Sequence, residues 1–451
     1  MNKLKAGFGR VNINPELGAP LAGYVEDRFT QGYIDNLEAN ALALSLGDAK
    51  LILVSLDNIG MRTNVLDSIR KEISDEQNIP FENILIGCTH THTGPLARLE
   101  AAANYKDNIV EKYVSFVGEK IKEATALAIN DLTDAKMGYG VGKAERITFN
   151  RRYLMKDGTI RTNPGVNNPE IDSCLGEVDE TVPVLRFDRA DGKHLILFNF
   201  ATHADVVGGS NVSADWPGLA RKTIEKVIDN SQSIFFNGTE GDQNHVNVHP
   251  VGGDFNDMFI DFDDVSRGYE HARHMGYVVA GSVMQCYQKV QYVDVDKISA
   301  IEKIINVPAN TATPEQIKNA YKIREMHLAG RDDELPFKGM MLTTAITEAN
   351  RMIRLEHGPD SFEMPMTGIK LGPVAFVSIP GEGFVKIGIE LKKNPNYDLV
   401  IPLGITNGAQ GYYPMMENFT EGGYEAACSN FRAGVAEQII NTGNELINSL
   451  I

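Results

Sequence analysis

Two histidines separated by a single residue form the sharpest chemical feature of the chain. His90 and His92 lie in the segment T-H-T-H-T-G-P at residues 89–95, directly after a short apolar run. Alternate residues of an extended chain point to the same side, so the two imidazoles share a face. This arrangement suits a metal ligand with a neighbouring acid or base. The alternative is a pair of hydrogen-bonded histidines in a polar loop, but the flanking hydroxyls and the Gly-Pro ending favour the metal.

Further candidates also follow apolar runs. His203 ends N-F-A-T-H at residues 199–203 and occupies the same position after a strand as His90, although a lone histidine there is more often buried and hydrogen-bonded. Glu382, in P-G-E at residues 380–382, follows a strand and begins a helix. The helix macrodipole favours a glutamate there without any chemical role, and from sequence alone that explanation is the stronger. The segment G-D-Q-N-H at residues 241–245 is either a turn or a source of another ligand, through His245 or the nearby His249.

Short apolar runs that stop at polar or glycine residues recur along the chain and position these candidates. Such runs are typical of buried strands, and amphipathic helical patterns lie between several of them. Strands that alternate with helices predict an α/β fold with a mixed central β-sheet flanked by helices. Ligands collect beyond the carboxyl ends of such strands, so we expect the active site there. The expected strands are residues 51–54, 84–86, 195–198, 234–236, 374–377 and 399–401, and the expected helices are residues 64–75, 109–130, 218–229, 268–289, 383–393 and 430–450.

No linker or internal repeat divides the chain, so residues 1–451 are expected to form one domain. The segment at about residues 300–358 differs, because it is polar and helix-like. Within it, T-P-E-Q at residues 313–316 is a typical helix start. We interpret this segment as a helical insertion or lid.

Charge and composition exclude several partners. Acidic residues outnumber basic ones by 60 to 43, for a formal net charge of −17, which disfavours nucleic acid and anionic membrane surfaces. The 4 cysteines show no C-x-x-C spacing, so neither a disulfide scaffold nor a cysteine zinc site is expected. No stretch reaches the ~18 apolar residues of a membrane span, and the basic N-terminus lacks the apolar core of a signal peptide. We expect a cytoplasmic protein without stable membrane insertion, although a secreted protein trimmed of its signal would look the same. The oligomeric state is not indicated.

These motifs resemble those of the neutral (non-lysosomal) ceramidases, zinc amidases of lipid metabolism that cleave the amide of N-acylsphingosines. T-H-T-H-T-G-P is similar to the family's T-H-T-H-S-G-P, and Tyr412 and Tyr424 are 12 positions apart, as in the family. Ala409, however, replaces the first tyrosine of the family's N-x-Y-x-x-Y. In order along nearly the whole chain, the resemblance also covers G-F-G-R at residues 7–10, P-L-A-G-Y at 20–24, N-R at 150–151, His203, P-G-E at 380–382 and Y-E at 424–425.

The resemblance implies a set of site residues and a cofactor, Zn²⁺. The implied zinc ligands are His90, His203, Glu382 and Tyr412. The implied catalytic residues are His92, Arg151 and Tyr424, which would bind the substrate carbonyl or its oxyanion, together with Asp242. Zinc favours such nitrogen and oxygen ligands, and a zinc ion with an open position activates water. Manganese or iron is not excluded by these ligand types.

Two departures from the family narrow the expected substrate. Asn244 stands where the family has a catalytic serine in G-D-x-S-P-N, so a mechanism that needs this hydroxyl is excluded, whereas zinc-activated water is not. No segment corresponds to the family's C-terminal immunoglobulin-like domain, and none is expected. We therefore expect a smaller or more polar substrate than ceramide.

The expected function is zinc-dependent hydrolysis of an amide bond in a small N-acylated molecule. Two alternatives stay open: a zinc-dependent esterase on the same scaffold, and a zinc-containing binding protein without catalysis. His92, Arg151 and Tyr424 weigh against the binding protein, because a structural zinc site does not need them.

Overall fold

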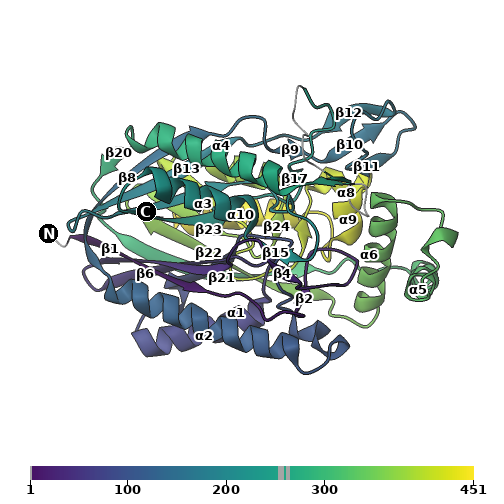
Figure 1. The fold of residues 1–451 in the computed structure, drawn as a ribbon, viewed down its shortest axis with the longest axis horizontal. Helices are drawn as coiled ribbons and strands as arrows, with labels where there is room; N and C mark the ends of the chain where they lie inside the picture. Colours follow the sequence, from purple (N-terminus) through teal and green to yellow (C-terminus); the bar gives the residue numbers. More distant parts are fainter. Residues whose placement is uncertain (1–2, 252–258, 261–264) are drawn as a thin grey trace.

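The computed structural model describes residues 3–251, 259–260 and 265–451, and its core is built on two sheets (Figure 1). The larger is a 9-stranded mixed sheet with the order β16-β14-β13-β8-β1-β5-β6-β7, in which β20 also pairs with β8. The smaller has the order β21-β22-β23-β25. The predicted α/β fold with a mixed sheet is confirmed. The strands are β1 (Leu4–Asn12), β5 (Glu38–Leu46), β6 (Ala49–Leu56), β7 (Ile84–Cys88), β8 (Thr133–Lys143), β13 (Thr181–Arg189), β14 (His194–Phe200), β16 (Ser231–Asn237), β20 (Gln291–Val293), β21 (Ile298–Pro308), β22 (Ser361–Leu371), β23 (Val374–Ser378) and β25 (Leu399–Leu403).

The large sheet consists of two arms that face each other. They are joined where Lys5 and Ala6 of β1 pair with Asp134 and Thr133 of β8. Side chains from the inner faces of both arms meet those of the small sheet in one central core, so three sheet surfaces exclude water from a common interior. Its buried members include Leu42, Leu53, Leu85, Phe187, Leu197, Phe236, Ile369 and Phe376.

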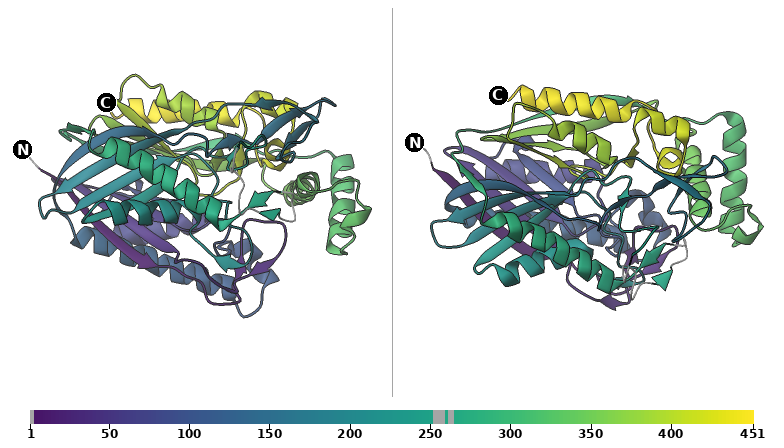
Figure 2. Two further views of the ribbon diagram at one scale, coloured as in Figure 1. Left: turned by 45° about the horizontal axis from the view of Figure 1, so that its top comes forward. Right: turned by 90° about the horizontal axis from the view of Figure 1, so that it is seen from above.

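The outer face of each sheet surface is covered by a pair of helices (Figures 1 and 2). Strand residues alternate between the inner and outer cores because successive side chains point to opposite faces: Leu53 lies in the central core and Val54 packs with the helices outside. The covering pairs are α1 (Thr63–Gln77) with α2 (Ile109–Asn130), α3 (Asp215–Val227) with α4 (Tyr269–Tyr287), and α7 (Val385–Lys392) with α10 (Val435–Asn448).

Three parallel strand pairs, each connected through a helix, bring their carboxyl ends together. They are β6–α1–β7, β14–α3–β16 and β23–α7–β25. Backbone hydrogen bonds join the carboxyl ends of the three pairs. Cys88 N–H donates to the carbonyl of Ile405 at 3.1 Å, and Gly404 N–H donates to the carbonyl of Asn237 at 2.9 Å. The loops that leave these ends therefore converge on one point, as expected for ligand sites in such sheets.

Gly404 permits this convergence because it has no side chain, and its replacement should destabilise the fold. A Cβ added there would lie 2.0 Å from the carbonyl oxygen of Gly238, which belongs to the backbone and cannot turn away. We expect Gly404→Ala to lower the free energy of unfolding by roughly 1–3 kcal/mol through overpacking. The matched control is Gly281→Ala in α4, where a Cβ meets nothing within 4 Å among the described residues. Urea denaturation should show that the control is neutral or stabilised, because alanine favours helix; equal loss in both variants would contradict the prediction.

The segment expected to be helical at about residues 300–358 is helical only from Pro314 onward. Residues up to Pro308 belong to β21, which pairs antiparallel with β22 over its whole length. The helical expectation is wrong for these residues because β21 is an edge strand in which only 2 of 11 residues are buried, which weakens the apolar alternation that marks a strand. The helices of the segment are α5 (Pro314–Leu328) and α6 (Met340–Leu355), with a short η3 (Asp332–Glu334) between them.

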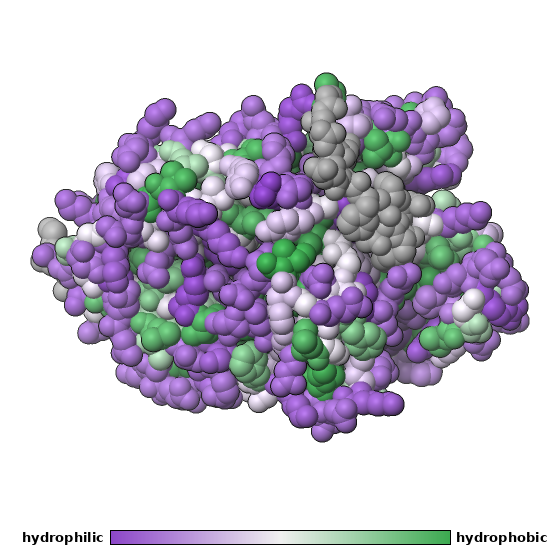
Figure 3. Space-filling view, in the orientation of Figure 1, coloured by the Kyte–Doolittle hydropathy of each residue, from purple (hydrophilic) through white to green (hydrophobic). Residues whose placement is uncertain are grey.

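Helices α5 and α6 lie at one end of the molecule (Figure 1). Within the described ranges, no helix combines the length and apolar character needed to cross a bilayer. The face in Figure 3 is mainly hydrophilic, with small separate apolar patches. The shorter elements are β2 (Pro20–Leu21), β3 (Arg28–Phe29), β4 (Gly32–Tyr33), β9 (Phe149–Asn150), β10 (Arg152–Met155), β11 (Ile160–Thr162), β12 (Ile171–Leu175), β15 (Asn211–Val212), β17 (Gln243–Asn244), β18 (Phe259–Ile260), β19 (Ser266–Arg267), β24 (Glu382–Gly383), β26 (Tyr412–Tyr413), α8 (Met416–Glu421), α9 (Tyr424–Cys428), η1 (Phe81–Asn83) and η2 (Leu99–Asn104).

Candidate metal centre and active site

His90 lies two residues after the end of β7 and is held in an unusual backbone conformation. Its φ of 68° lies in the left-handed region, which costs a non-glycine residue about 1–3 kcal/mol and is concentrated at functional sites. Its backbone N–H donates to the carbonyl of Asn58 at 2.9 Å. Its ring Nδ1 lies 2.7 Å from the carbonyl of Ile59, which can only accept, so Nδ1 carries the proton. Nε2 is therefore the nitrogen left free to bind a metal.

His203 is oriented in the same way at the end of β14. Its Nδ1 donates to the carbonyls of Glu240 at 3.0 Å and Gln243 at 2.9 Å, which leaves Nε2 as the nitrogen without a proton. Burial, with a contribution from the nearby Arg151, lowers the pKa of His203 to about 4. The imidazole is thus neutral at neutral pH, which is the form that ligates metals.

Glu382 joins the two histidines at a single point. Its Oε2 lies 3.4 Å from Nε2 of His90 and 3.4 Å from Nε2 of His203, and it has no hydrogen-bond partner among the described residues. Burial alone would raise the pKa of Glu382, but the two histidines hold that pKa well below its usual range. Tyr412 is the register partner of Glu382 in the parallel β24–β26 pair, so its side chain leaves the same face beside the glutamate.

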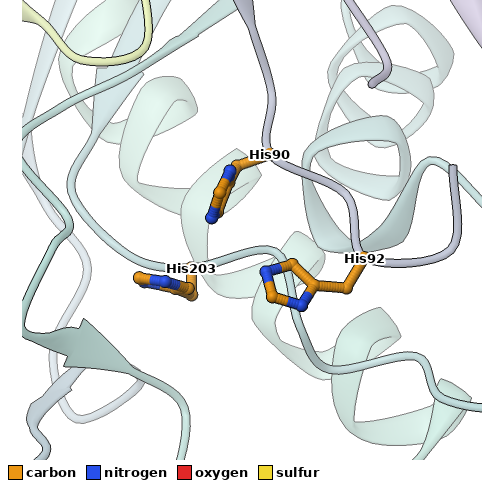
Figure 4. A group of neighbouring side chains, drawn as sticks. All are labelled: His90, His92 and His203. Carbon is orange, nitrogen blue, oxygen red and sulfur yellow. The ribbon is translucent and has the colours of Figure 1, made fainter. Parts of the chain in front are cut away.

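Ring nitrogens of His90, His92 and His203 lie within 4.8 Å of one another, and the same holds for ligand atoms of His90, Glu240 and Glu382. The three imidazoles turn toward a common space, as Figure 4 shows. Glu240 is a candidate that sequence reasoning missed, although its position just after β16 was a usable signal. It is fully buried with both oxygens unpartnered in the described part of the chain, and burial raises its pKa well above the usual value.

His92 is buried beside the metal candidates and faces a carboxylate. Its Nδ1 lies 3.5 Å from Oδ1 of Asp205, and neither ring nitrogen has a hydrogen-bond partner in the described residues. Asp205 is fixed by Arg267, which donates to its two oxygens at 3.0 Å each, and by the hydroxyl of Tyr24. Burial lowers the pKa of His92 well below its usual value, although Asp205 opposes this shift. Asp205 was not selected from the sequence, although it too follows β14.

Arg151 crosses from β9 into the site and is anchored by a buried carboxylate. Its Nε donates to Glu425 at 2.6 Å, Nη2 donates to the carbonyl of Gly241 at 2.8 Å, and Nη1 lies 3.3 Å from Nε2 of His203. The guanidinium carbon is 5.5 Å from the ring centroid of Tyr412 and 5.8 Å from that of Tyr424. Burial raises the pKa of Tyr424, so its hydroxyl remains a hydrogen-bond donor at neutral pH.

The G-D-Q-N-H segment supports the surrounding backbone. One oxygen of Asp242 accepts from Val385 N–H at 2.8 Å and the other from Asn150 Nδ2 at 2.7 Å, so both point into the scaffold. Asn244 Nδ2 donates to Asn163 at 2.9 Å. Nε2 of His245 donates to the carbonyl of Ser266 at 2.6 Å, and His245 belongs to neither group of possible metal ligands found among the described residues.

Two adjoining cavities provide room for a ligand. One, of about 400 Å³, is lined by six of the proposed site residues, His90, His92, Arg151, Glu382, Tyr412 and Tyr424. The other, of about 780 Å³, lies between α6, α9 and the β10–β11 hairpin and shares Asn163, Met340 and Tyr424 with the first. Both volumes fall within the range of small-molecule sites, roughly 300–1,000 Å³.

Neither a protein-family model nor a curated protein matches this sequence. Solved structures do match. The neutral ceramidase of Pseudomonas aeruginosa has a TM-score of 0.75 with 16% sequence identity, over 100% of this chain and 75% of that one. A ceramidase in complex with C2 has a TM-score of 0.73 with 15% identity over the same shares. The chain therefore has the fold of the neutral ceramidases, and the resemblance indicated by the motifs is confirmed at the level of the fold.

Proposed function

We propose that this protein is a zinc-dependent hydrolase that cleaves an amide bond in an N-acylated molecule. The observation that carries the proposal is the meeting of His90 Nε2, His203 Nε2 and an otherwise unpartnered Glu382 oxygen at one buried point, with 3.4 Å from each nitrogen to that oxygen. In both rings the N–H of the other nitrogen donates to backbone carbonyls, the arrangement that orients metal-binding histidines. The ceramidase fold supports the same chemistry.

The donor set fits zinc. Two neutral imidazoles and a carboxylate, with Tyr412 beside them, give the nitrogen and oxygen ligands of a catalytic zinc site. When bound in such a site, zinc lowers the pKa of a water ligand to about 7 and so supplies hydroxide at neutral pH. Nε2 of His203 would have to exchange its 3.3 Å contact with Arg151 for the metal. Arg151 keeps its bonds to Glu425 and Gly241 after this exchange, so its position is preserved.

The remaining residues act on the substrate. Arg151 and Tyr424 present hydrogen-bond donors that can stabilise negative charge on the carbonyl oxygen of the amide during attack. His92, neutral and facing Asp205, accepts a proton at one ring nitrogen and returns it to the leaving amine. No serine is required, because the nucleophile is water. Asn244, at the position of the family serine, instead donates a hydrogen bond to Asn163.

His92→Ala tests the catalytic part of the proposal. On a panel of N-acyl amides and matched esters, we expect kcat to fall about 10²- to 10⁴-fold, the usual contribution of a general acid or base, while zinc content stays at the wild-type level. His357→Ala is the control, because that side chain is 88% exposed. Wild-type cleavage of esters alone would favour an esterase. Loss of zinc in His92→Ala would make His92 a ligand instead, and unchanged kcat would remove its proposed role.

A further inference from the structure

Three arginines from separate elements converge on the cavity that contains the metal candidates. Arg62 immediately precedes α1, Arg98 immediately precedes η2, and Arg354 lies in the last turn of α6. All three line the cavity of about 400 Å³ together with His90 and Glu382. We define these three residues as the arginine cluster.

Most of the positive charge of the arginine cluster has no carboxylate partner. Arg62 forms an ion pair with Glu100. The side chain of Arg98 makes neither an ion pair nor a hydrogen bond within the described ranges, and its Nε is buried without a partner there. Arg354 donates to the amide oxygen of Asn430 at 2.5 Å and has no ion pair with any described residue. Arg98 is half-buried with its Nε enclosed, and Arg354 is exposed at the cavity, so both present guanidinium groups without a carboxylate partner to a ligand in that cavity.

A shortage of acidic residues does not explain why these arginines have no carboxylate partner, because the chain has 60 acidic residues and 43 basic ones. Carboxylates that line the same cavity, those of Glu26, Asp27, Asp205 and Glu382, do not pair with the arginine cluster. Asp205 instead pairs with Arg267.

The three guanidinium groups of the arginine cluster also repel one another. Burial lowers the pKa of Arg98, and Arg62 adds to this shift. Partial desolvation by the surrounding protein likewise lowers the pKa of Arg354, with further contributions from Arg62 and Arg98. The three guanidinium groups are therefore close enough to repel one another, and a bound anion would relieve that repulsion. Glu100 and then Glu382 act on the pKa of Arg98 in the opposite direction, and the shared cavity places the cluster near the metal candidates.

We propose that the arginine cluster binds an oxyanion on the substrate, such as a carboxylate, close to the amide that is cleaved. Guanidinium forks match carboxylate and phosphate geometry. This inference rests on the proposed hydrolase function and specifies its substrate class: N-acyl compounds with an acidic group near the amide, such as N-acylated amino acids. An N-acylsphingosine carries no charge and would leave the cluster unpaired.

Binding of two non-hydrolysable probes to the full chain as purified tests the proposal without relying on activity. N-octylglycine carries the carboxylate, and N-octylethanolamine replaces it with an alcohol. We expect calorimetry to show that N-octylglycine binds at least about ten-fold more tightly, and that Arg98→Gln and Arg354→Gln each weaken it by about ten- to a hundred-fold. Arg331→Gln is the control, because that exposed arginine pairs with Glu334 away from both cavities. Thermal unfolding of each variant verifies folding.

Equal affinity for the two probes, or undiminished N-octylglycine affinity in both Arg98→Gln and Arg354→Gln, would overturn the proposal. The second result would mean that the carboxylate binds elsewhere, for example at the metal. Failure of the hydrolase function is separable: N-octylglycine would still bind through the cluster, but N-octanoylglycine would not be cleaved. Conversely, cleavage of neutral and acidic N-acyl amides at equal rates would retain the hydrolase and refute the oxyanion site.

Discussion

Zinc content is expected to fall from about one ion per chain to near zero when His203 is replaced by alanine. His203 presents Nε2 to the same Glu382 oxygen that faces His90, and its other nitrogen is fixed by two backbone carbonyls. Removing the imidazole therefore deletes one corner of the site without providing a substitute. Altering groups that only orient ligands costs 10- to 100-fold in metal affinity or activity, so loss of a ligand itself should cost more than about 100-fold. Metal analysis after dialysis and amide hydrolysis by the same sample measure both effects.

Two further variants determine which residues belong to the ligand set. Tyr412→Phe removes a single oxygen from the site, and we expect faster loss of zinc to a chelator with an unchanged fold. His357→Ala, at a histidine whose side chain is 88% exposed, should retain both zinc and activity. Full zinc occupancy in His203→Ala would remove the ligand assignment, and unchanged zinc retention in Tyr412→Phe would limit the site to His90, His203 and Glu382.

The sequence predicts the parts of this centre that depend on strand ends. The six expected strands all occur, and His90 and His203 follow two of them, because short apolar runs mark strands buried on both faces. Their carboxyl ends must meet if the strands belong to parallel units, so the sequence predicts that the two histidines lie close together. The helix expected at residues 109–130 is also confirmed with these bounds, since its apolar stripe is long and regular.

Other parts of the centre depend on long-range geometry that periodicity does not encode. Periodicity gives Glu382 no more than the place of a glutamate at a helix start, the family resemblance implies that it is a ligand, and its two 3.4 Å contacts with histidines depend on the folded chain. Asp205 and Glu240 follow the same strands as recognised candidates, but their orientation toward the site follows from how the sheets are packed. Arg98 and Arg354 are 256 positions apart (354 − 98) and come to line one cavity only in the folded chain.

Replacement of Arg151 by methionine is expected to lower the free energy of unfolding by about 3–5 kcal/mol, because it leaves a buried carboxylate without its partner. Glu425 is fully buried, and its Oε1 accepts from Arg151 Nε at 2.6 Å. The other oxygen is 4.0 Å from Arg152 Nε and 3.2 Å from the hydroxyl of Thr162, too little to compensate for a full charge. Urea denaturation measures the change, and a loss below about 1 kcal/mol, the value of an exposed pair, would contradict it.

A double variant separates this structural role from catalysis. In Arg151→Met with Glu425→Gln, no buried charge is left unpaired, and a buried ion pair can often be replaced by neutral groups at little cost. We therefore expect most of the stability to return. Activity should remain low, because donors directed at the developing charge of the transition state are worth about 10²- to 10³-fold in kcat and the methionine supplies none. Recovery of stability together with kcat would show that Arg151 serves only to neutralise Glu425. Recovery of stability alone, with zinc still bound, would place its guanidinium in the reaction, since the two losses would then have different physical origins.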